Sequence, residues 1–171
     1  MPLSNSSCRL RAVEPQDIDR IYLWENDPSV WPAGDRPVPV SRHSVEMFVL
    51  EGGDVVSTGR LRLMIETVEG RCIGAVDLFE FDALNRRAGV GILIYDPADR
   101  RRGYASSALR LLCDYCRTSL GMHQLWCTVA AHNEASEALF RSCGFECAGR
   151  RRDWFAGREG WGDALFMQKI L

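Results

Sequence analysis

Several features that would place a chain in a specialised class are absent from this sequence. No apolar run approaches the roughly 20 residues that a membrane-spanning helix needs. The N-terminal stretch MPLSNSSCRLR has no apolar segment after its charges, unlike a secretory signal. The formal net charge is −2, which gives no broad basic surface. We therefore expect a cytoplasmic protein that makes no membrane contact and does not bind nucleic acids in general.

Motifs for metals and for nucleoside triphosphates are missing as well. There is no GxxxxGK[ST], which disfavours a P-loop NTPase. Cys113 and Cys116 form a CxxC inside an apolar helical pattern, but no second CxxC or HxxxH lies near enough to complete a zinc site. His43, His123 and His132 are scattered. We expect no metal, and we expect the seven cysteines to be free thiols, with the CxxC pair in the core.

The sequence pattern predicts one α/β domain over residues 1–171, without repeats or linkers. Expected strands cover 8–13, 61–68, 72–81, 87–95, 124–130, 147–155 and 164–170. Expected helices begin at Pro15, at a cap on Ser41 or Ser44, at Gly103 and at Glu134. The segment 25–40 holds four prolines and is expected to be a loop or a broken helix. Mixed strands and helices favour a sheet with helices on both faces.

The strongest functional pattern is a strand, a loop and a helix in GVGILIYDPADRRRGYASSALRLL. Backbone N–H groups at a helix start lack internal partners and carry partial positive charge. Gly103 would let a ligand approach the backbone closely, and the arginines of 100–102 would add charge-assisted donors. The pattern predicts a pyrophosphate site. A basic triplet alone would instead be typical of a solvated turn.

These residues resemble the GCN5-related N-acetyltransferase (GNAT) family. Residues 100–105 match its acetyl-CoA motif [Q/R]-x-x-G-x-[G/A], and NEASEALFRSCGF resembles its later N-x-x-[A/S]…GF helix about 30 residues on. The branch that it resembles most holds ribosomal-protein N-terminal and spermidine N-acetyltransferases. The resemblance implies a single-domain GNAT fold, with a mixed, mostly antiparallel, twisted sheet of about seven strands splayed at its centre. It also implies a possible homodimer formed through the late strands.

The resemblance implies acetyl-CoA as co-substrate, with its pantetheine arm where the strand ending at Ile94 splays from the strand 124–130. A backbone N–H near Ile94 would stabilise the oxyanion. Gly89 and Gly91 indicate either this close approach or a bend without ligand. The implied cofactor-binding residues are Ile92, Leu93, Ile94, Arg100, Arg101, Arg102, Gly103, Tyr104, Ala105, Ser106, Asn133, Ser136 and Phe140.

The catalytic groups are less determined. Many relatives have a tyrosine acid where this chain has Phe140. The ribosomal-protein branch looks to use the serine of its N-x-x-S instead, so the resemblance implies Ser136 as the acid, although Ser136 could instead cap its helix. Asp77 and Glu80 are candidate bases. Three residues apart, they face opposite sides of a regular strand unless a bulge intervenes. Gly89 stands where polyamine enzymes have a further acid, which weakens the polyamine assignment.

Two functions follow from the resemblance. The first is an N-acetyltransferase acting on a primary amine, either a small polyamine-like molecule or a protein N-terminus. The alternative, favoured by Phe140, is an acyl-CoA-binding sensor with little or no turnover. Glu25 and Asp27, with Trp24 and Trp31, either line the acceptor pocket or form an ordinary helix end. The arginines 150–152 indicate a solvated strand face or a contact with an acidic partner. The sequence leaves the acceptor amine open.

Overall fold

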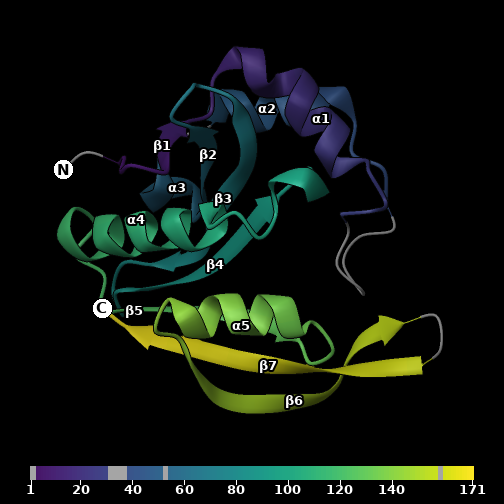
Figure 1. The fold of residues 1–171 in the computed structure, drawn as a ribbon, viewed down its shortest axis with the longest axis vertical. Helices are drawn as coiled ribbons and strands as arrows, with labels where there is room; N and C mark the ends of the chain where they lie inside the picture. The colour runs from purple at the N-terminus through teal and green to yellow at the C-terminus, as the bar shows by residue number, and fades with distance from the viewer. Residues whose placement is uncertain (1–2, 31–37, 52–53, 158–159) are drawn as a thin grey trace.

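One twisted sheet with strand order β1-β2-β3-β4-β5-β7-β6 organises the described residues, which are 3–30, 38–51, 54–157 and 160–171 of a computed structural model (Figure 1). Its strands are β1 (Cys8–Ala12), β2 (Leu61–Thr67), β3 (Cys72–Asp82), β4 (Arg87–Ile94), β5 (Gln124–Ala130), β6 (Glu146–Gly157) and β7 (Gly160–Ile170). The α-helices are α1 (Ile18–Glu25), α2 (Arg42–Glu51), α3 (Val55–Thr58), α4 (Tyr104–Thr118) and α5 (Glu134–Ser142). Two 3-10 turns, η1 (Pro15–Asp17) and η2 (Pro97–Asp99), precede α1 and α4.

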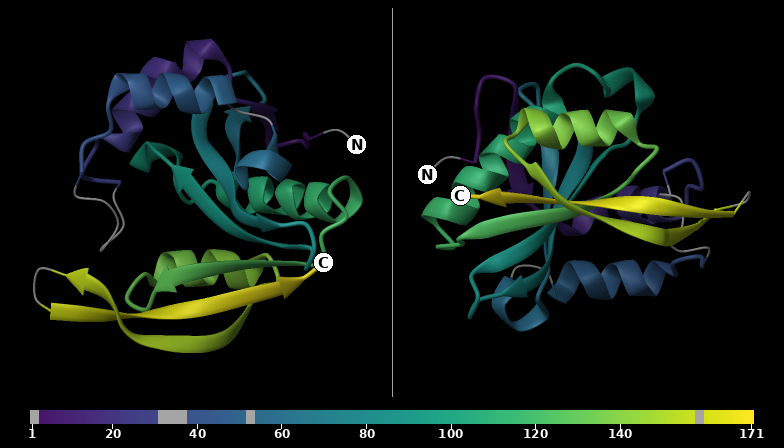
Figure 2. Two further views of the ribbon diagram at one scale, coloured as in Figure 1. Left: turned by 180° about the vertical axis from the view of Figure 1, so that it is seen from behind. Right: turned by 90° about the horizontal axis from the view of Figure 1, so that it is seen from below.

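The sheet changes character between β4 and β5. This pair is parallel, whereas the other neighbours pair antiparallel. The parallel pairing holds for only three residues on each strand, from Arg87 opposite Gln124 to Gly89 opposite Trp126. Beyond that point the two strands diverge (Figure 2). The predicted mixed, mostly antiparallel and centrally splayed sheet is confirmed.

Helices cover both faces because the central strands are apolar on both sides. On β2, Leu63 and Ile65 belong to the core under α4 and α5, while Met64 packs with α1 and α2 on the opposite face. This is the two-residue alternation of a strand buried on both faces. The CxxC pair, Cys113 and Cys116, lies in the core under α4 and α5. Cys116 has no exposed surface there, and desolvation raises the pKa of its thiol to about 12.

Some expected boundaries differ from the structure. The strand predicted to begin at Ala164 begins at Gly160, because the paired backbone of β6 and β7 continues as far as Gly157 opposite Gly160. The helix α3 was not predicted, since it has only four residues and depends on a local cap at Asp54, which accepts hydrogen bonds from the N–H groups of Val56 and Ser57. The cap of α2 is Ser41, whose hydroxyl accepts from the Ser44 N–H at 3.0 Å.

A buried ion network joins the start of α1 to the first two strands. Asp17 has no exposed surface and accepts hydrogen bonds from Arg11 at 2.6 and 2.8 Å and from Arg20 at 2.8 Å. Arg11 also pairs with Glu66 of β2. Burial by itself would raise the pKa of Asp17, but the hydrogen bonds and charge of Arg11 and Arg20 outweigh it and hold that pKa below its ordinary value.

We expect Asp17→Asn to lower the free energy of unfolding at pH 7 by about 2–3 kcal/mol, because it removes the buried carboxylate that Arg11 and Arg20 share and leaves Arg11 with Glu66 alone. The native state lowers the pKa of this carboxyl, so its contribution is complete above the ordinary value of 3.8 and is lost as the pH falls below it. Urea unfolding at pH 7 and near pH 3 measures this, with the gap between variant and parent closing at the lower pH.

Asp19→Asn is the matched control, since Asp19 is two residues away and its side chain is 81% exposed in a pair with Arg42. Its effect should stay within about 0.5 kcal/mol. If the two substitutions lowered the free energy of unfolding equally, the buried network would contribute no more to stability than the exposed pair, which would contradict the prediction.

Candidate active site

The divergence of β4 from β5 leaves backbone groups of β4 without a strand partner. The N–H of Tyr95 donates to the Ile73 carbonyl of β3 at 3.0 Å. Because antiparallel strands alternate in the direction of their hydrogen bonds, the N–H groups of Ile92 and Ile94 point away from β3. They face the side on which β5 has already separated. These groups can therefore bond to an extended ligand lying beside β4, as an added strand would.

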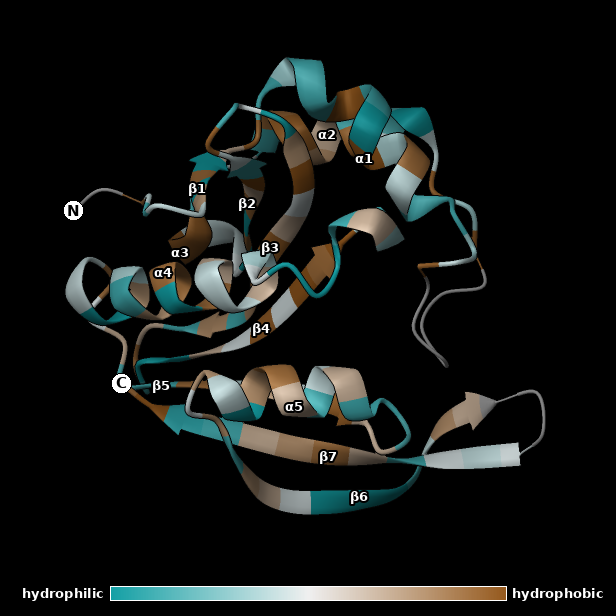
Figure 3. Cartoon of the chain, in the orientation of Figure 1, coloured by the Kyte–Doolittle hydropathy of each residue, from teal (hydrophilic) through white to brown (hydrophobic). Residues whose placement is uncertain are grey.

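The loop that follows β4 delivers a glycine to the start of α4. Gly103 is the N-cap residue with a φ of 84°, and Arg101 is also left-handed at 58°. A Cβ at Gly103 would meet nothing within 4 Å, so the backbone is open to a ligand there. Figure 3 shows a hydrophobic end of β4 followed by a hydrophilic loop. The geometry fits a pyrophosphate held by helix-start N–H groups.

The three arginines of this loop have different partners. Arg100 donates to the carbonyls of Ile94 and Tyr95 at 3.1 and 3.0 Å, so its guanidinium fastens the loop to the end of β4. Arg101 is exposed, and Arg102 is exposed beside the ring of Tyr104 with only a loose ion pair, 3.8 Å from Asp99. The loop therefore offers two guanidinium groups to an anionic ligand and uses the third for its own shape.

A buried carboxylate of the same loop anchors it to the turn between β2 and β3. Asp99 is 3% exposed and accepts two hydrogen bonds of 2.6 Å from Arg71, which stands at the turn between β2 and β3. This bidentate pair holds the pKa of Asp99 below its ordinary value. The loop is thus tied to the sheet at Asp99 and at Arg100. Sequence reasoning missed the pairing, because Arg71 lies 28 residues away in the chain.

The start of α5 is capped by Asn133, whose side chain accepts from the Ser136 N–H at 3.0 Å. The hydroxyl of Ser136 is therefore not needed as a cap, and it makes no hydrogen bond within the described part of the chain. Phe140, one turn further along, is 3% exposed and packs edge-on against Phe145 with ring centroids 5.0 Å apart. Ser136, in contrast, is partly exposed, and its hydroxyl has no hydrogen-bond partner among the described residues.

Two glycines of the central strands are required by close contacts within the protein. A Cβ at Gly89 would overlap with the Phe79 ring. A Cβ at Gly74 would overlap with the Leu93 carbonyl oxygen. Gly91 has ordinary space beside Asp77. The close approach at Gly89 is thus made by an aromatic ring of β3, which gives this glycine a packing role.

The two candidate bases have different surroundings. Asp77 accepts from Arg62 at 2.7 and 3.1 Å, and Arg62 also pairs with Glu25 at 2.6 Å. Burial lowers the pKa of Arg62, but the two carboxylates outweigh it, so the guanidinium stays charged. Glu80 is exposed and has no ion pair or hydrogen bond among the described residues.

An irregularity in β3 determines where Glu80 points. The register of β3 with β4 shifts between Phe79 and Asp82, and Glu80 has a φ of 48°, an uncommon value for a residue other than glycine. Such bulges re-aim side chains and are frequent beside active sites. A bulge that breaks the regular alternation between Asp77 and Glu80 is therefore present. It directs the Glu80 side chain into a pocket.

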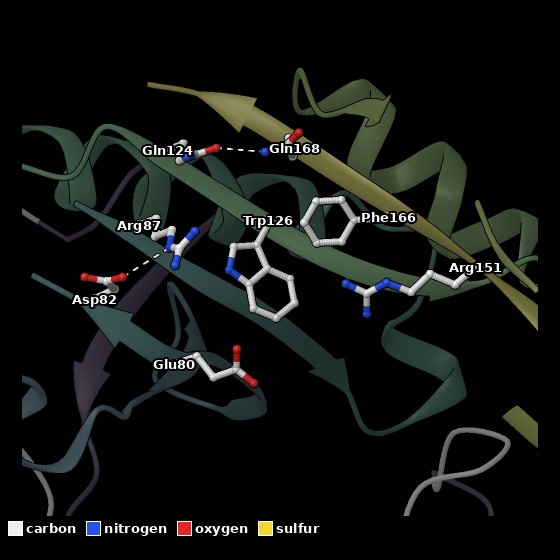
Figure 4. Close-up of a pocket in the computed structure, with 8 residues that line it drawn as sticks. All are labelled: Glu80, Asp82, Arg87, Gln124, Trp126, Arg151, Phe166 and Gln168. Carbon is white, nitrogen blue, oxygen red and sulfur yellow. Dashed lines mark hydrogen bonds and ion pairs between the residues drawn. The ribbon is translucent and has the colours of Figure 1, made fainter. Parts of the chain in front are cut away.

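This pocket, which we call the Trp126 pocket, has a volume of about 380 Å³ and lies where the pairing of β4 with β5 ends (Figure 4). It is lined by Glu80, Asp82, Arg87, Gln124, Trp126, Arg151, Phe166 and Gln168. Trp126 is its central aromatic residue, 5.2 Å from Phe79 and 5.5 Å from Phe166 between ring centroids. Sequence reasoning missed Trp126, since a tryptophan in a strand is also typical of a packed sheet.

The residues of the segment WENDPSVW do not line this pocket. Trp24 is buried and stacks on Tyr95 at 5.4 Å, and Asp27 accepts from the Tyr95 hydroxyl at 2.8 Å. Glu25 is held by Arg62. Trp31 lies outside the described residues. The helix-end interpretation fits Trp24, Glu25 and Asp27.

Other features of the described residues give no further site. No group of three or more His, Cys, Asp or Glu in this part of the chain could hold a metal ion. His43, His123 and His132 are exposed. Within the ranges that the structure describes, no helix has the length and apolar character to cross a bilayer.

Known proteins share both the sequence and the shape of this chain. Spermidine N(1)-acetyltransferase of Escherichia coli is 29% identical over 149 residues, covering 85% of this chain and 76% of the relative. The [ribosomal protein bS18]-alanine N-acetyltransferase of Salmonella typhimurium is 39% identical over 72 residues, 42% of this chain and 48% of the relative. A crystal structure of spermidine N-acetyltransferase from Vibrio cholerae with CoA and spermine has a TM-score of 0.87 at 25% identity, over 97% of this chain and 96% of that one.

The relatives agree with the expectations drawn from the two sequence motifs. They come from both branches that the motifs resemble, and the CoA-bound neighbour supports acetyl-CoA as co-substrate. Because these relatives are acetyltransferases, the sensor alternative is not favoured. Residues 8–146 match the acetyltransferase (GNAT) domain, and the chain belongs to that family as an acetyl-CoA-dependent N-acetyltransferase.

Proposed function

We propose that the acceptor is a primary amine bound in the Trp126 pocket, with Glu80 as the group that attracts and deprotonates it. The observation that carries this proposal is the unpaired carboxylate of Glu80, aimed into the pocket at the point where β4 and β5 separate. An amine must be neutral to attack a thioester, and a carboxylate with no other partner can accept its proton directly or through water. Asp77 is a weaker candidate because Arg62 occupies both of its oxygens.

The residues around the β4–β5 separation fit acetyl-CoA. The N–H groups of Ile92 and Ile94 would hold its pantetheine arm, and the start of α4 with Arg101 and Arg102 would hold its pyrophosphate. When bound, the co-substrate supplies an acetyl group activated as a thioester. The contacts assigned to Leu93, Tyr104, Ala105, Ser106, Asn133 and Phe140 stay predictions. For Phe140 the contact is limited to the 3% of its surface that is exposed.

We propose Ser136 as the donor of the proton that the leaving thiolate requires. Its hydroxyl lies at the start of α5, and Asn133 has taken the capping role that would otherwise explain a serine there. The serine also lies one turn before Phe140, on the same face of the helix. The chain thus keeps a hydroxyl close to the position where many relatives place a phenol.

Self-association through the last two strands stays a proposal as well. Trp154 on β6 and Trp161 on β7 are 50% and 68% exposed. Large exposed aromatic residues on one hairpin favour a contact with another surface. A homodimer formed there would cover both rings.

The proposed activity is tested by mixing purified protein with acetyl-CoA and a panel of amines and following thiol release. The panel holds polyamines, amino acids, aminoglycosides and N-terminal peptides. We expect release with at least one amine class and an about 100-fold lower kcat for Glu80→Gln, since general bases contribute on this scale. Acetyl-CoA binding without release from any amine would contradict the proposal and favour the sensor.

The anchoring of the loop predicts a separate effect on the co-substrate. Asp99→Asn removes the charge that holds Arg71, so we expect the Kd for acetyl-CoA to rise about tenfold, or about 1.4 kcal/mol. Isothermal titration calorimetry measures the change. The matched control is Asp96→Asn, in the same loop, because asparagine can keep the cap that Asp96 makes with the Ala98 N–H. Equal weakening by both variants would argue against the anchor.

For Ser136 we expect a change in turnover without a change in binding. Ser136→Ala should lower kcat about 100-fold and leave acetyl-CoA affinity nearly unchanged, while Ser136→Thr should retain part of the activity. Ser142→Ala at the other end of α5 is the control. The Ser142 hydroxyl donates to the Leu139 carbonyl of the same helix and shares a second hydrogen bond with the neighbouring Cys143 thiol, in which either group can be the donor. An unaltered kcat in Ser136→Ala would discard the role.

A further inference from the structure

The Trp126 pocket contains a second unpaired charge, of the opposite sign to Glu80. Its other charged residues neutralise each other, since Arg87 pairs with Asp82 at 3.2 Å. The amides of Gln124 and Gln168 are likewise joined at 2.8 Å (Figure 4). Arg151 has no carboxylate partner among the described residues. Once these internal pairs are set aside, one carboxylate and one guanidinium remain available to a ligand.

Arg151 is held in place rather than extended into solvent. Its guanidinium lies 4.9 Å from the centroid of the Phe166 ring and 4.4 Å from that of Trp154. Stacking on two rings orients the charge while leaving its N–H donors free. Its neighbours behave differently, because Arg150 pairs with Asp163 and Arg152 is exposed. The run is therefore not uniform, since Arg151 is only partly exposed whereas Arg150 and Arg152 are exposed.

Backbone irregularities stand beside both charges. The β3 bulge lies at Glu80. A second register shift, in β6, runs from Arg151 to Phe155 and contains Asp153, which has a φ of 47°. Irregularities of this kind bend a strand and redirect its side chains. Their coincidence at the two residues with unused charges indicates that both side chains are directed into the pocket for a ligand.

We propose that the acceptor is an amine that also carries a carboxylate, with Arg151 as the residue that selects it. The amine lies toward Glu80, the carboxylate is bound by Arg151, and the apolar part between them packs on Trp126 and Phe166. This inference rests on the proposed function and narrows it. A purely cationic amine such as a polyamine would meet the like charge of Arg151, which costs binding energy. The volume of about 380 Å³ suits a molecule of amino-acid to dipeptide size.

Matched substrates test the inference directly. Leucine, methionine and phenylalanine are compared with their carboxamides, which keep the amine and the side chain but lose the anionic group. We expect kcat/KM to be about tenfold or more higher for the carboxylates, since a charge-assisted bidentate contact is lost in the amides. Spermidine and an aminoalkylphosphonate complete the panel and report on a cationic acceptor and on a phosphate-type anion.

Variants then assign the preference to one residue. Arg151→Gln should raise KM for the carboxylates to the level of the amides and leave the amides unchanged. Arg152→Gln, on the adjacent exposed residue, should leave both unchanged. Equal use of carboxylates and amides by the parent protein would overturn the proposal. So would a stronger preference for spermidine or for the phosphonate, or an equal loss on both members of a pair in Arg151→Gln.

Failure of the proposed function is recognised separately. If no amine releases thiol, calorimetric binding of the same pairs in the presence of CoA still decides the role of Arg151. Carboxylate binding that Arg151→Gln removes and Arg152→Gln keeps supports the inference. Binding that does not distinguish carboxylate from amide, or no binding of either, overturns it.

Discussion

The early end of pairing between β4 and β5 is the constraint on which the site depends. A parallel pair that continued to Ile94 would use the N–H groups of β4 internally and would leave no place for an extended ligand. Three paired residues keep the two halves of the sheet joined, while the rest of β4 stays open. Phe79 and Trp126 pack edge-to-face over the last pair, which closes the junction where the pairing stops.

Guanidinium groups hold the surroundings of this opening in place. Arg62 joins Glu25 of α1 to Asp77 of β3, Arg71 holds Asp99, and Arg100 binds the carbonyls at the end of β4. Planar, multidentate donors suit this task because each fixes two acceptors at once. The arrangement also sorts the charged residues of the site. Those with short internal pairs shape the protein, and those that are unpaired, or paired as loosely as Arg102 is with Asp99 at 3.8 Å, are the ones that we propose for ligands.

The sequence predicted the elements and the cofactor motif well, because these depend on local signals. Hydrophobic periodicity and the glycine after three arginines are properties of adjacent residues, and the structure places Gly103 at the helix start with a left-handed φ. Pairings between distant segments were not predictable. Arg71 meets Asp99 across 28 residues, and Arg151 reaches Phe166 only through the strand register of β6 and β7. The proposed role of Glu80 depends on a bulge that the alternation of side chains could allow but not locate.

The packing of Phe140 suits a phenylalanine better than the tyrosine that many relatives have at this position. The ring is buried against Phe145, so a hydroxyl at this position would have to reach out of the core to find a partner. Ser136 is four residues earlier on the same helix face, and its hydroxyl is left free by the Asn133 cap. With Ser136 as the proposed donor, the polar group stands on a partly exposed residue one turn nearer the helix start, and position 140 serves packing alone.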